Sequence, residues 1–137
     1  MAGVRLGMAF AHKTLIAFLN RIKAPYNINS LSLTAASEQL KKQDLVKEQV
    51  AILLKERSRL ELVLQDLHWV VSCFPSDANF ILIRVDDSAL RYKQFIQAGI
   101  VVRNSSKSLG CENTLRITVG TPKENNILIE VLQALDN

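Results

Sequence analysis

Ile100-Val-Val-Arg-Asn and Asn113-Thr-Leu-Arg-Ile-Thr-Val-Gly-Thr are the two stretches of this chain that decide its fold. Each contains a short apolar run of β type, over residues 100–102 and 115–119, and a polar loop over residues 105–114 joins them. Branched apolar residues on both sides of a polar loop are typical of two paired strands. We therefore predict neighbouring strands here, joined as a hairpin.

Each of the two runs carries an arginine at its edge. Arg103 follows the first run, and Arg116 lies inside the second. A guanidinium turned into an apolar core would leave five N–H donors unpaired, so Arg116 must reach solvent, a carboxylate of the protein or an anionic ligand. The hairpin brings Arg103 near it. Because a guanidinium fork matches carboxylate and phosphate groups, the pair suggests a substrate with two anionic groups.

The composition describes a globular chain of about one domain. Its 137 residues are 48% hydrophobic and carry a formal net charge of +4. A basic chain can bind nucleic acid, but here lysine and arginine are spread over every segment and no nucleic-acid-binding motif is present. We therefore predict no nucleic-acid partner.

Thiols and imidazoles are too few and too scattered for a metal centre. Cys73 and Cys111 lack metal-ligand spacing, and His12 and His68 are the only histidines, so we predict neither a metal site nor a catalytic triad. Nothing resembles a secretory signal, which favours a cytoplasmic location with both thiols free. No apolar run approaches the roughly 20 residues of a membrane helix, so we predict no membrane partner.

The first half of the chain reads as one strand followed by three helices. Residues 4–11 form an apolar, strand-like run, and a helix with apolar residues at three–four spacing opens at His12. Pro25 ends that helix. We predict a second helix over residues 31–41 with Ser30 as its N-cap, and a long amphipathic helix over residues 43–67.

From Gln43 onward the predicted order is helix, strand, strand, helix, strand, strand, helix. The first two strands cover residues 69–74 and 79–85, and a helix over residues 88–98 ends at Gly99. Pro122 opens the last helix. This order predicts an α+β, two-layer sandwich, a mostly antiparallel sheet with helices on one face.

Four blocks of sequence, in the same order, resemble the C-terminal part of histidinol-phosphate aminotransferases. The blocks are Ala2-Gly-Val-Arg-Leu-Gly, Lys23-Ala-Pro-Tyr-Asn-Ile-Asn, Phe74-Pro-Ser-Asp-Ala-Asn-Phe-Ile-Leu-Ile, and Gly99-Ile-Val-Val-Arg together with Leu115-Arg-Ile-Thr-Val-Gly-Thr-Pro-Lys-Glu-Asn-Asn. These relatives are pyridoxal-phosphate enzymes of the aspartate-aminotransferase fold type. The resemblance covers essentially the whole chain, but only about the last third of a typical family member.

The resemblance implies a function, a domain division and roles for three arginines. Family members exchange an amino group between histidinol phosphate and 2-oxoglutarate in histidine biosynthesis. Residues 1–27 would be a remnant of the large cofactor-binding domain and hinge, and residues 28–137 the small C-terminal domain with its long bridging helix. Arg5 would bind the phosphate of pyridoxal phosphate. Arg103 would bind the phosphate of histidinol phosphate, and Arg116 the substrate carboxylate or the equivalent end of the substrate.

The family's Schiff-base lysine precedes the block that begins at Ala2, in a Ser-Lys-type loop, and would fall before Met1. We therefore assign no catalytic residue in this chain and expect it to be inactive alone. The alternative is a non-catalytic binding or oligomerisation module from a truncated paralogue. Aminotransferases for other amino acids and a cobalamin-pathway decarboxylase are nearby possibilities within the fold. We expect a homo-oligomer that associates through the first helix or through residues 4–11, because a strand there would lack ladder partners. The alternative is disorder of the residues before about Asn27.

Overall fold

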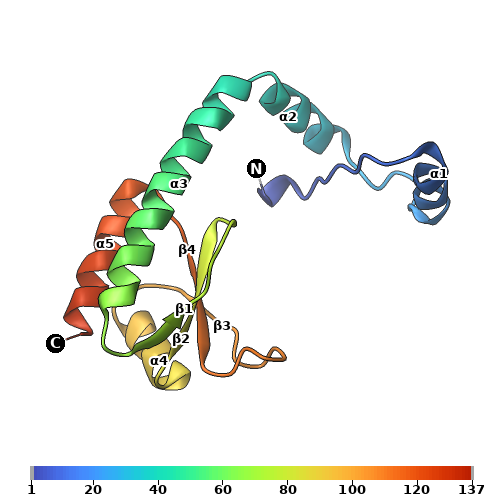
Figure 1. Cartoon of the computed structure of the whole chain (residues 1–137). Coiled ribbons are helices and arrows are strands. Elements are labelled where there is room, and N and C mark those ends of the chain that lie inside the picture. The colour runs from blue at the N-terminus through green and yellow to red at the C-terminus, as the bar shows by residue number, and fades with distance from the viewer. Residues whose placement is uncertain (1, 137) are drawn as a thin grey trace. The chain divides into compact units, whose positions relative to one another are not determined.

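The computed structural model describes residues 2–136 (Figure 1). The chain divides into two compact units, and the boundary along the sequence falls between Lys47 and Glu48. The first unit holds a 3₁₀ turn, η1, two helices and the start of a third. These are η1 (Ala2–Val4), α1 (Lys13–Ile22), α2 (Ser30–Leu40) and α3 (Gln43–Asp66). The rest of α3 and all later elements belong to the second unit.

The second unit contains one four-stranded sheet. Its elements after α3 are β1 (Val70–Cys73), β2 (Phe80–Val85), α4 (Ser88–Gln97), β3 (Arg103–Asn104), β4 (Thr114–Thr118) and α5 (Pro122–Ala134). The strand order is β1-β2-β4-β3, and every neighbouring pair is antiparallel. The predicted sequence of elements from Gln43 and the mostly antiparallel sheet are confirmed.

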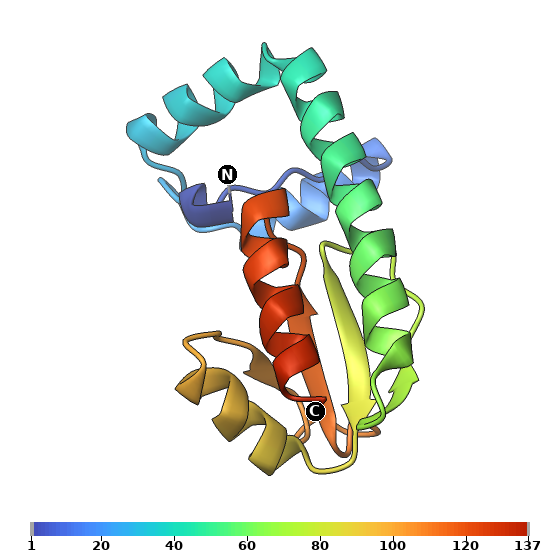
Figure 2. The same ribbon diagram turned by 90° about the vertical axis from the view of Figure 1, so that its left-hand side faces the viewer.

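The core of the second unit lies between the sheet and its helices. Alternation along the strands turns one set of side chains toward α3, α4 and α5, which lie in front of the sheet in Figure 2. The buried apolar residues are Leu60, Leu64, Leu67, Trp69, Ile81, Ile83, Val85, Phe95, Val102, Leu115, Ile117, Val119, Leu128 and Leu132. The two-layer α+β sandwich predicted from the sequence is therefore confirmed.

One predicted strand is wrong in its bounds, and another is absent. Residues 100–102 are not a strand, because the amide of Ile100 donates to Phe95 at the end of α4 and that of Gly99 donates to Ile96. These two bonds and the φ of +77° at Gly99 form a Schellman motif, so β3 begins only at Arg103. Residues 5–12 form no regular structure, since every strand of the described chain belongs to the sheet of the second unit.

The start of α2 also differs from the prediction by one residue. Asn29, not Ser30, is the N-cap, and its side chain accepts a hydrogen bond of 2.8 Å from the amide of Ser32. Both residue types cap helices well, and the chain places Asn29 in the extended conformation that the cap position requires.

A buried polar cluster fixes the turn that follows β4. Asn125, on α5, donates to Glu56 of α3 at 2.9 Å and to the carbonyl of Gly120 at 3.1 Å, and it accepts from the amide of Gly120 at 3.0 Å. Arg59 adds a contact to Glu56 at 3.3 Å. Glu56 is only 4% exposed although it carries a carboxylate. Burial is tolerated because each oxygen has a partner.

Candidate functional site

The side of the sheet that faces away from the helices carries the two arginines that the sequence singled out. We call it the open face and define it by Phe80, Leu82 and Arg84 of β2, Arg103 of β3, and Arg116 and Thr118 of β4. Arg103 and Arg116 are directly opposite partners in the β3–β4 pair. Directly opposite residues point to the same side of a sheet, so both side chains lie on the open face, as the predicted hairpin required.

Arg116 is held by the sheet and has no acidic partner. Its guanidinium lies over the ring of Phe80, 4.8 Å from the centroid, and its buried Nε makes no hydrogen bond. Among residues 2–136, no carboxylate forms an ion pair with Arg103 or Arg116. Like charges directly opposite in a sheet repel each other, so an anion bound between them would stabilise the arrangement.

A third arginine, Arg84, belongs to the open face, and the sequence analysis did not single it out. Its Nε donates to the carbonyl of Glu112 and its Nη2 to that of Gly110, each at 3.1 Å. Its guanidinium also lies 5.6 Å from the ring centroid of Phe74. The alternation along β2 was visible in the sequence and placed Arg84 on the side opposite the core. Its contacts to the loop before β4 required the structure.

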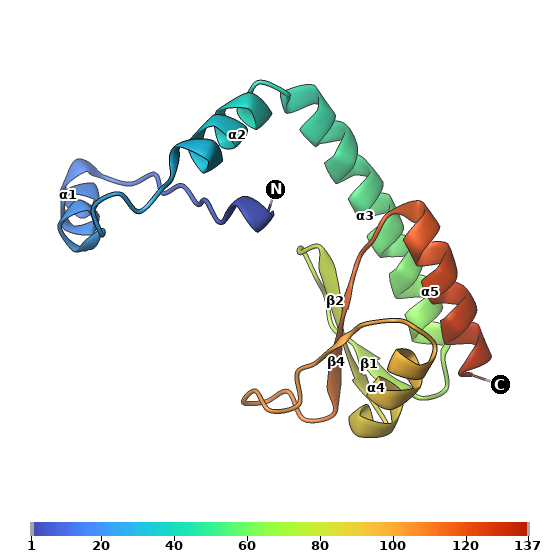
Figure 3. The same cartoon turned by 180° about the vertical axis from the view of Figure 1, so that it is seen from behind.

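The loop between β3 and β4, residues 105–113, extends from the edge of the sheet (Figure 3) and is anchored on its other side to α4. Ser106 Oγ lies 2.8 Å from Ser88 Oγ, and the amide nitrogen of the Asn104 side chain donates to the carbonyl of Ser88 at 3.4 Å. At the base of the loop, the amide of Ser105 donates to the carbonyl of Thr114 at 3.0 Å. The segment that joins the two arginines is therefore bonded on both sides.

Arg5, assigned from the sequence to a cofactor phosphate, lies in the first unit. Its side chain is exposed, its φ is +57°, and within residues 2–136 it forms no ion pair with a carboxylate. A positive φ is uncommon for a residue with a side chain, so the surrounding chain imposes this backbone conformation. An exposed guanidinium without an acidic neighbour suits a phosphate dianion in charge and in hydrogen-bonding capacity.

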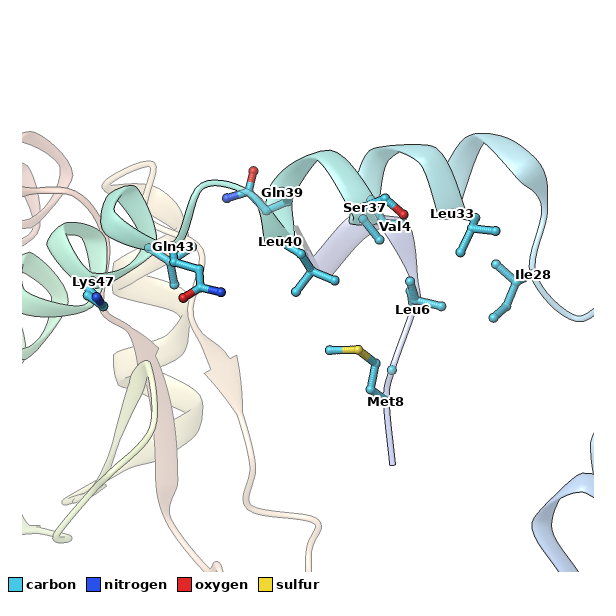
Figure 4. Close-up of a pocket in the computed structure, with 13 residues that line it drawn as sticks. Val4, Leu6, Met8, Ile28, Leu33, Ser37, Gln39, Leu40, Gln43 and Lys47 are labelled. Carbon is cyan, nitrogen blue, oxygen red and sulfur yellow. The ribbon is translucent and has the colours of Figure 1, made fainter. Parts of the chain in front are cut away.

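The first unit also contains an apolar groove of about 710 Å³ (Figure 4). Leu6 and Met8 of the irregular segment lie on the same side of α2 as Leu33 and Leu40, which point toward them. Among the described residues that line it, Lys47 alone is charged. An apolar groove with one cation does not match a substrate with two anionic groups, so the open face is the better candidate for substrate recognition.

The remaining groups give no sign of another reaction centre. No three His, Cys, Asp or Glu side chains of residues 2–136 are grouped so that they could hold a metal ion. Burial, with a smaller effect of Glu61, raises the pKa of the Cys73 thiol, which disfavours the nucleophilic thiolate. No helix between residues 2 and 136 has the length and apolar character needed to cross a membrane.

Comparison with known proteins decides the family. The family model described as aminotransferase class I and II matches residues 1–132. The chain belongs to the class I and II aminotransferases. The resemblance found in the four sequence blocks is thereby confirmed, and the antiparallel sheet with its open face is the part of an aminotransferase that these residues build.

Two curated relatives of this aminotransferase chain carry the same name. Histidinol-phosphate aminotransferase of Flavobacterium johnsoniae is 43% identical over 136 residues, and that of Flavobacterium psychrophilum is 47% identical over 135 residues. The chain spans 39% of the length of each of these two relatives. The crystal structure of a putative histidinol-phosphate aminotransferase from Erwinia carotovora atroseptica aligns with a TM-score of 0.84 at 26% identity, covering 98% of this chain and 38% of that one.

Proposed function

We propose that this chain is the C-terminal portion of a histidinol-phosphate aminotransferase and that its open face recognises the anionic groups of the substrates. The names of the relatives support the reaction, the transfer of an amino group between histidinol phosphate and 2-oxoglutarate. One observation carries the assignment of the face. Arg103 and Arg116 lie directly opposite each other, and neither has a carboxylate partner among residues 2–136.

The two arginines have complementary tasks in this proposal. Arg103, exposed at the edge of the sheet, binds the phosphate of histidinol phosphate. Arg116 binds the carboxylate of the oxo acid or the equivalent end of the amino substrate. Its contact with Phe80 and its position within β4 fix the guanidinium before a substrate arrives, which reduces the ordering cost of binding.

Pyridoxal phosphate, the cofactor of this family, would supply an electron sink for the chemistry at the amino-bearing carbon of the substrate. Arg5 is the residue of this chain that we assign to its phosphate. Residues 1–27 would then belong to the cofactor-binding domain and hinge, and residues 28–137 to the small domain. We also infer a cytoplasmic location and assembly as a homo-oligomer, in keeping with a biosynthetic enzyme that acts on small-molecule substrates.

Binding of histidinol phosphate to the chain tests the arginine pair. We expect Arg116→Ala and Arg103→Ala each to weaken binding about tenfold or more, since a hydrogen bond to a charged group contributes about 1.5–3 kcal/mol. Titration calorimetry on the chain and both variants measures this. Exposed Lys93 on α4 provides the control, because Lys93→Ala removes the same charge away from the open face. Equal affinity in the wild type and in Arg116→Ala would contradict the assignment.

Turnover tests the other half of the proposal. We assign the Schiff-base lysine to none of these 137 residues, so the chain alone should not convert histidinol phosphate and 2-oxoglutarate to glutamate in the presence of pyridoxal phosphate. Glutamate formation is measured over time against a full-length relative as the positive control. Turnover that a single lysine substitution in this chain abolishes would show that the assignment is wrong.

A further inference from the structure

We propose that Arg84 is a positioning residue for the arginine pair. It holds the loop between β3 and β4 so that Arg103 stays opposite Arg116. The inference rests on the proposed function, because it gives the geometry of that anion site a cause. Arg84 lies on the open face with Arg103 and Arg116, yet its fork is occupied by two carbonyl groups of its own chain.

The strand β3 is held in register only weakly by its own ladder. This strand has only two residues, and in the order β1-β2-β4-β3 it has β4 as its single neighbour. A strand this short holds its register poorly by its own ladder. A slip by one residue would turn Arg103 to the opposite side of the sheet and separate it from Arg116. The closure of the loop over residues 105–113 must therefore contribute to the register.

Arg84 closes that loop through its hydrogen bonds. Its Nε and Nη2 donate to the carbonyls of Glu112 and Gly110, which lie on either side of Cys111. Arg84 is also the ladder partner of Thr114, whose carbonyl accepts from the amide of Ser105 at the base of the loop. One guanidinium thus fixes the limb of the loop that enters β4.

Holding the loop at two points requires an arginine at position 84. Two acceptors on separate residues are matched by two N–H groups of one planar fork, whereas a lysine ammonium is a single point on a flexible stem. The ring of Phe74, 5.6 Å from the Arg84 guanidinium, restricts that fork further. Lysine would keep the positive charge and lose the two-point hold. This difference separates positioning from electrostatic attraction.

Amide hydrogen exchange and phosphate binding test the inference together, on the full chain as wild type, Arg84→Lys, Arg84→Ala, Arg116→Ala and the control Lys93→Ala. We expect exchange at Ser105 to accelerate about tenfold or more in both Arg84 variants, while the core amide of Leu132 on α5 stays protected. Titration with inorganic phosphate, followed by shifts in amide resonances, should show affinity about tenfold weaker in both Arg84 variants and unchanged in Lys93→Ala.

Two results would overturn the role of Arg84. Wild-type protection and phosphate affinity in Arg84→Lys would mean that Arg84 acts by its charge alone. Loss of Ser105 protection with unchanged phosphate affinity would make Arg84 an anchor of the loop that does not position the pair. Failure of the proposed function is seen separately, as unchanged phosphate affinity in Arg116→Ala. In that case the Ser105 exchange rates in the Arg84 variants still decide whether the loop depends on this fork.

Discussion

The two units of this chain contain similar amphipathic helices, but the apolar side of the helix is buried in one unit and exposed in the other. In the second unit, α5 buries Leu128 and Leu132 in a core of fourteen apolar side chains. In the first unit, α1 exposes Leu15, Phe18 and Ile22 by more than half, and none of residues 3–47 is buried. The comparison shows that spacing decides which side of a helix is apolar. A neighbouring layer decides whether that side becomes a core.

Truncation of a buried leucine should give the largest difference between the two units in the loss of unfolding free energy. Leu64→Ala opens a cavity beneath the sheet and should lower the free energy of unfolding by about 2–5 kcal/mol. Leu33→Ala in α2 is the matched change in the first unit and should cost less than about 1 kcal/mol, because Leu33 is 56% exposed. Urea unfolding followed by far-UV circular dichroism, to which the helices of both units contribute, measures both. Equal losses would contradict the contrast between the units.

Truncation within the buried polar cluster should give the next largest loss of unfolding free energy. Asn125→Ala leaves Glu56 and both backbone groups of Gly120 without their partner, so we expect a loss of about 2–3 kcal/mol. Glu130→Ala is the control at an exposed residue of the same helix and should cost less than about 1 kcal/mol. The same urea titration applies. If the two variants were equally stable, the cluster would not hold α5 to α3.

Self-association should depend on the uncovered apolar side of α1. Phe18→Asp should weaken dimer formation about tenfold or more, since burying a phenylalanine is worth about 1.5–3 kcal/mol. Asn20→Asp introduces the same charge on the polar side of α1 and serves as the control. Analytical ultracentrifugation over a concentration series gives both dissociation constants. A monomer at all concentrations in the wild type would show that this side of α1 has no partner copy.

The smallest effect concerns acid stability within the second unit. The hydrogen bond from Arg91 lowers the pKa of Asp86 from 3.8 to about 2. The Asp86 carboxylate therefore stabilises the folded state above about pH 4, and this contribution is lost as the pH falls toward 2. Asp86 is about half exposed, so solvent screening reduces the effect to about 1 kcal/mol.

Unfolding of Asp86→Asn at pH 7 and at pH 2 tests this expectation. The variant should be less stable than the wild type at neutral pH and nearly equal to it at the lower pH. Asp66→Asn, an exposed carboxyl at the end of α3, is the control and should show no such convergence. A constant difference between Asp86→Asn and the wild type across this range would contradict the role of the ion pair.

Most of the second unit could be predicted from residue patterns because its signals are local. Alternation in β2, the cap at Asp87, Gly99 after α4 and Pro122 at the start of α5 each act within a few residues. The strand predicted over residues 4–11 had an equally apolar pattern and was wrong, because a strand also needs a partner to accept its hydrogen bonds.

The candidate site, too, could be predicted from the sequence only in part. An arginine inside Leu115-Arg-Ile-Thr-Val was visible in the sequence as a group that cannot enter a core, and the hairpin pattern brought Arg103 near it. Nothing local distinguished Arg84 from any solvated strand residue, or Glu56 from its polar neighbours on α3. Their partners are Gly110, Glu112 and Asn125, which lie far along the chain.

The sequence by itself determined the family resemblance, the order of elements in the second unit and the sides of its strands, since these follow from residue type and spacing. Only the tertiary structure decided the register that sets Arg103 opposite Arg116, the hold of Arg84 on the loop and the burial of Glu56 against Asn125. Hydrogen bonds between distant residues are made or lost according to the packing of whole elements, and no short stretch of sequence contains both partners.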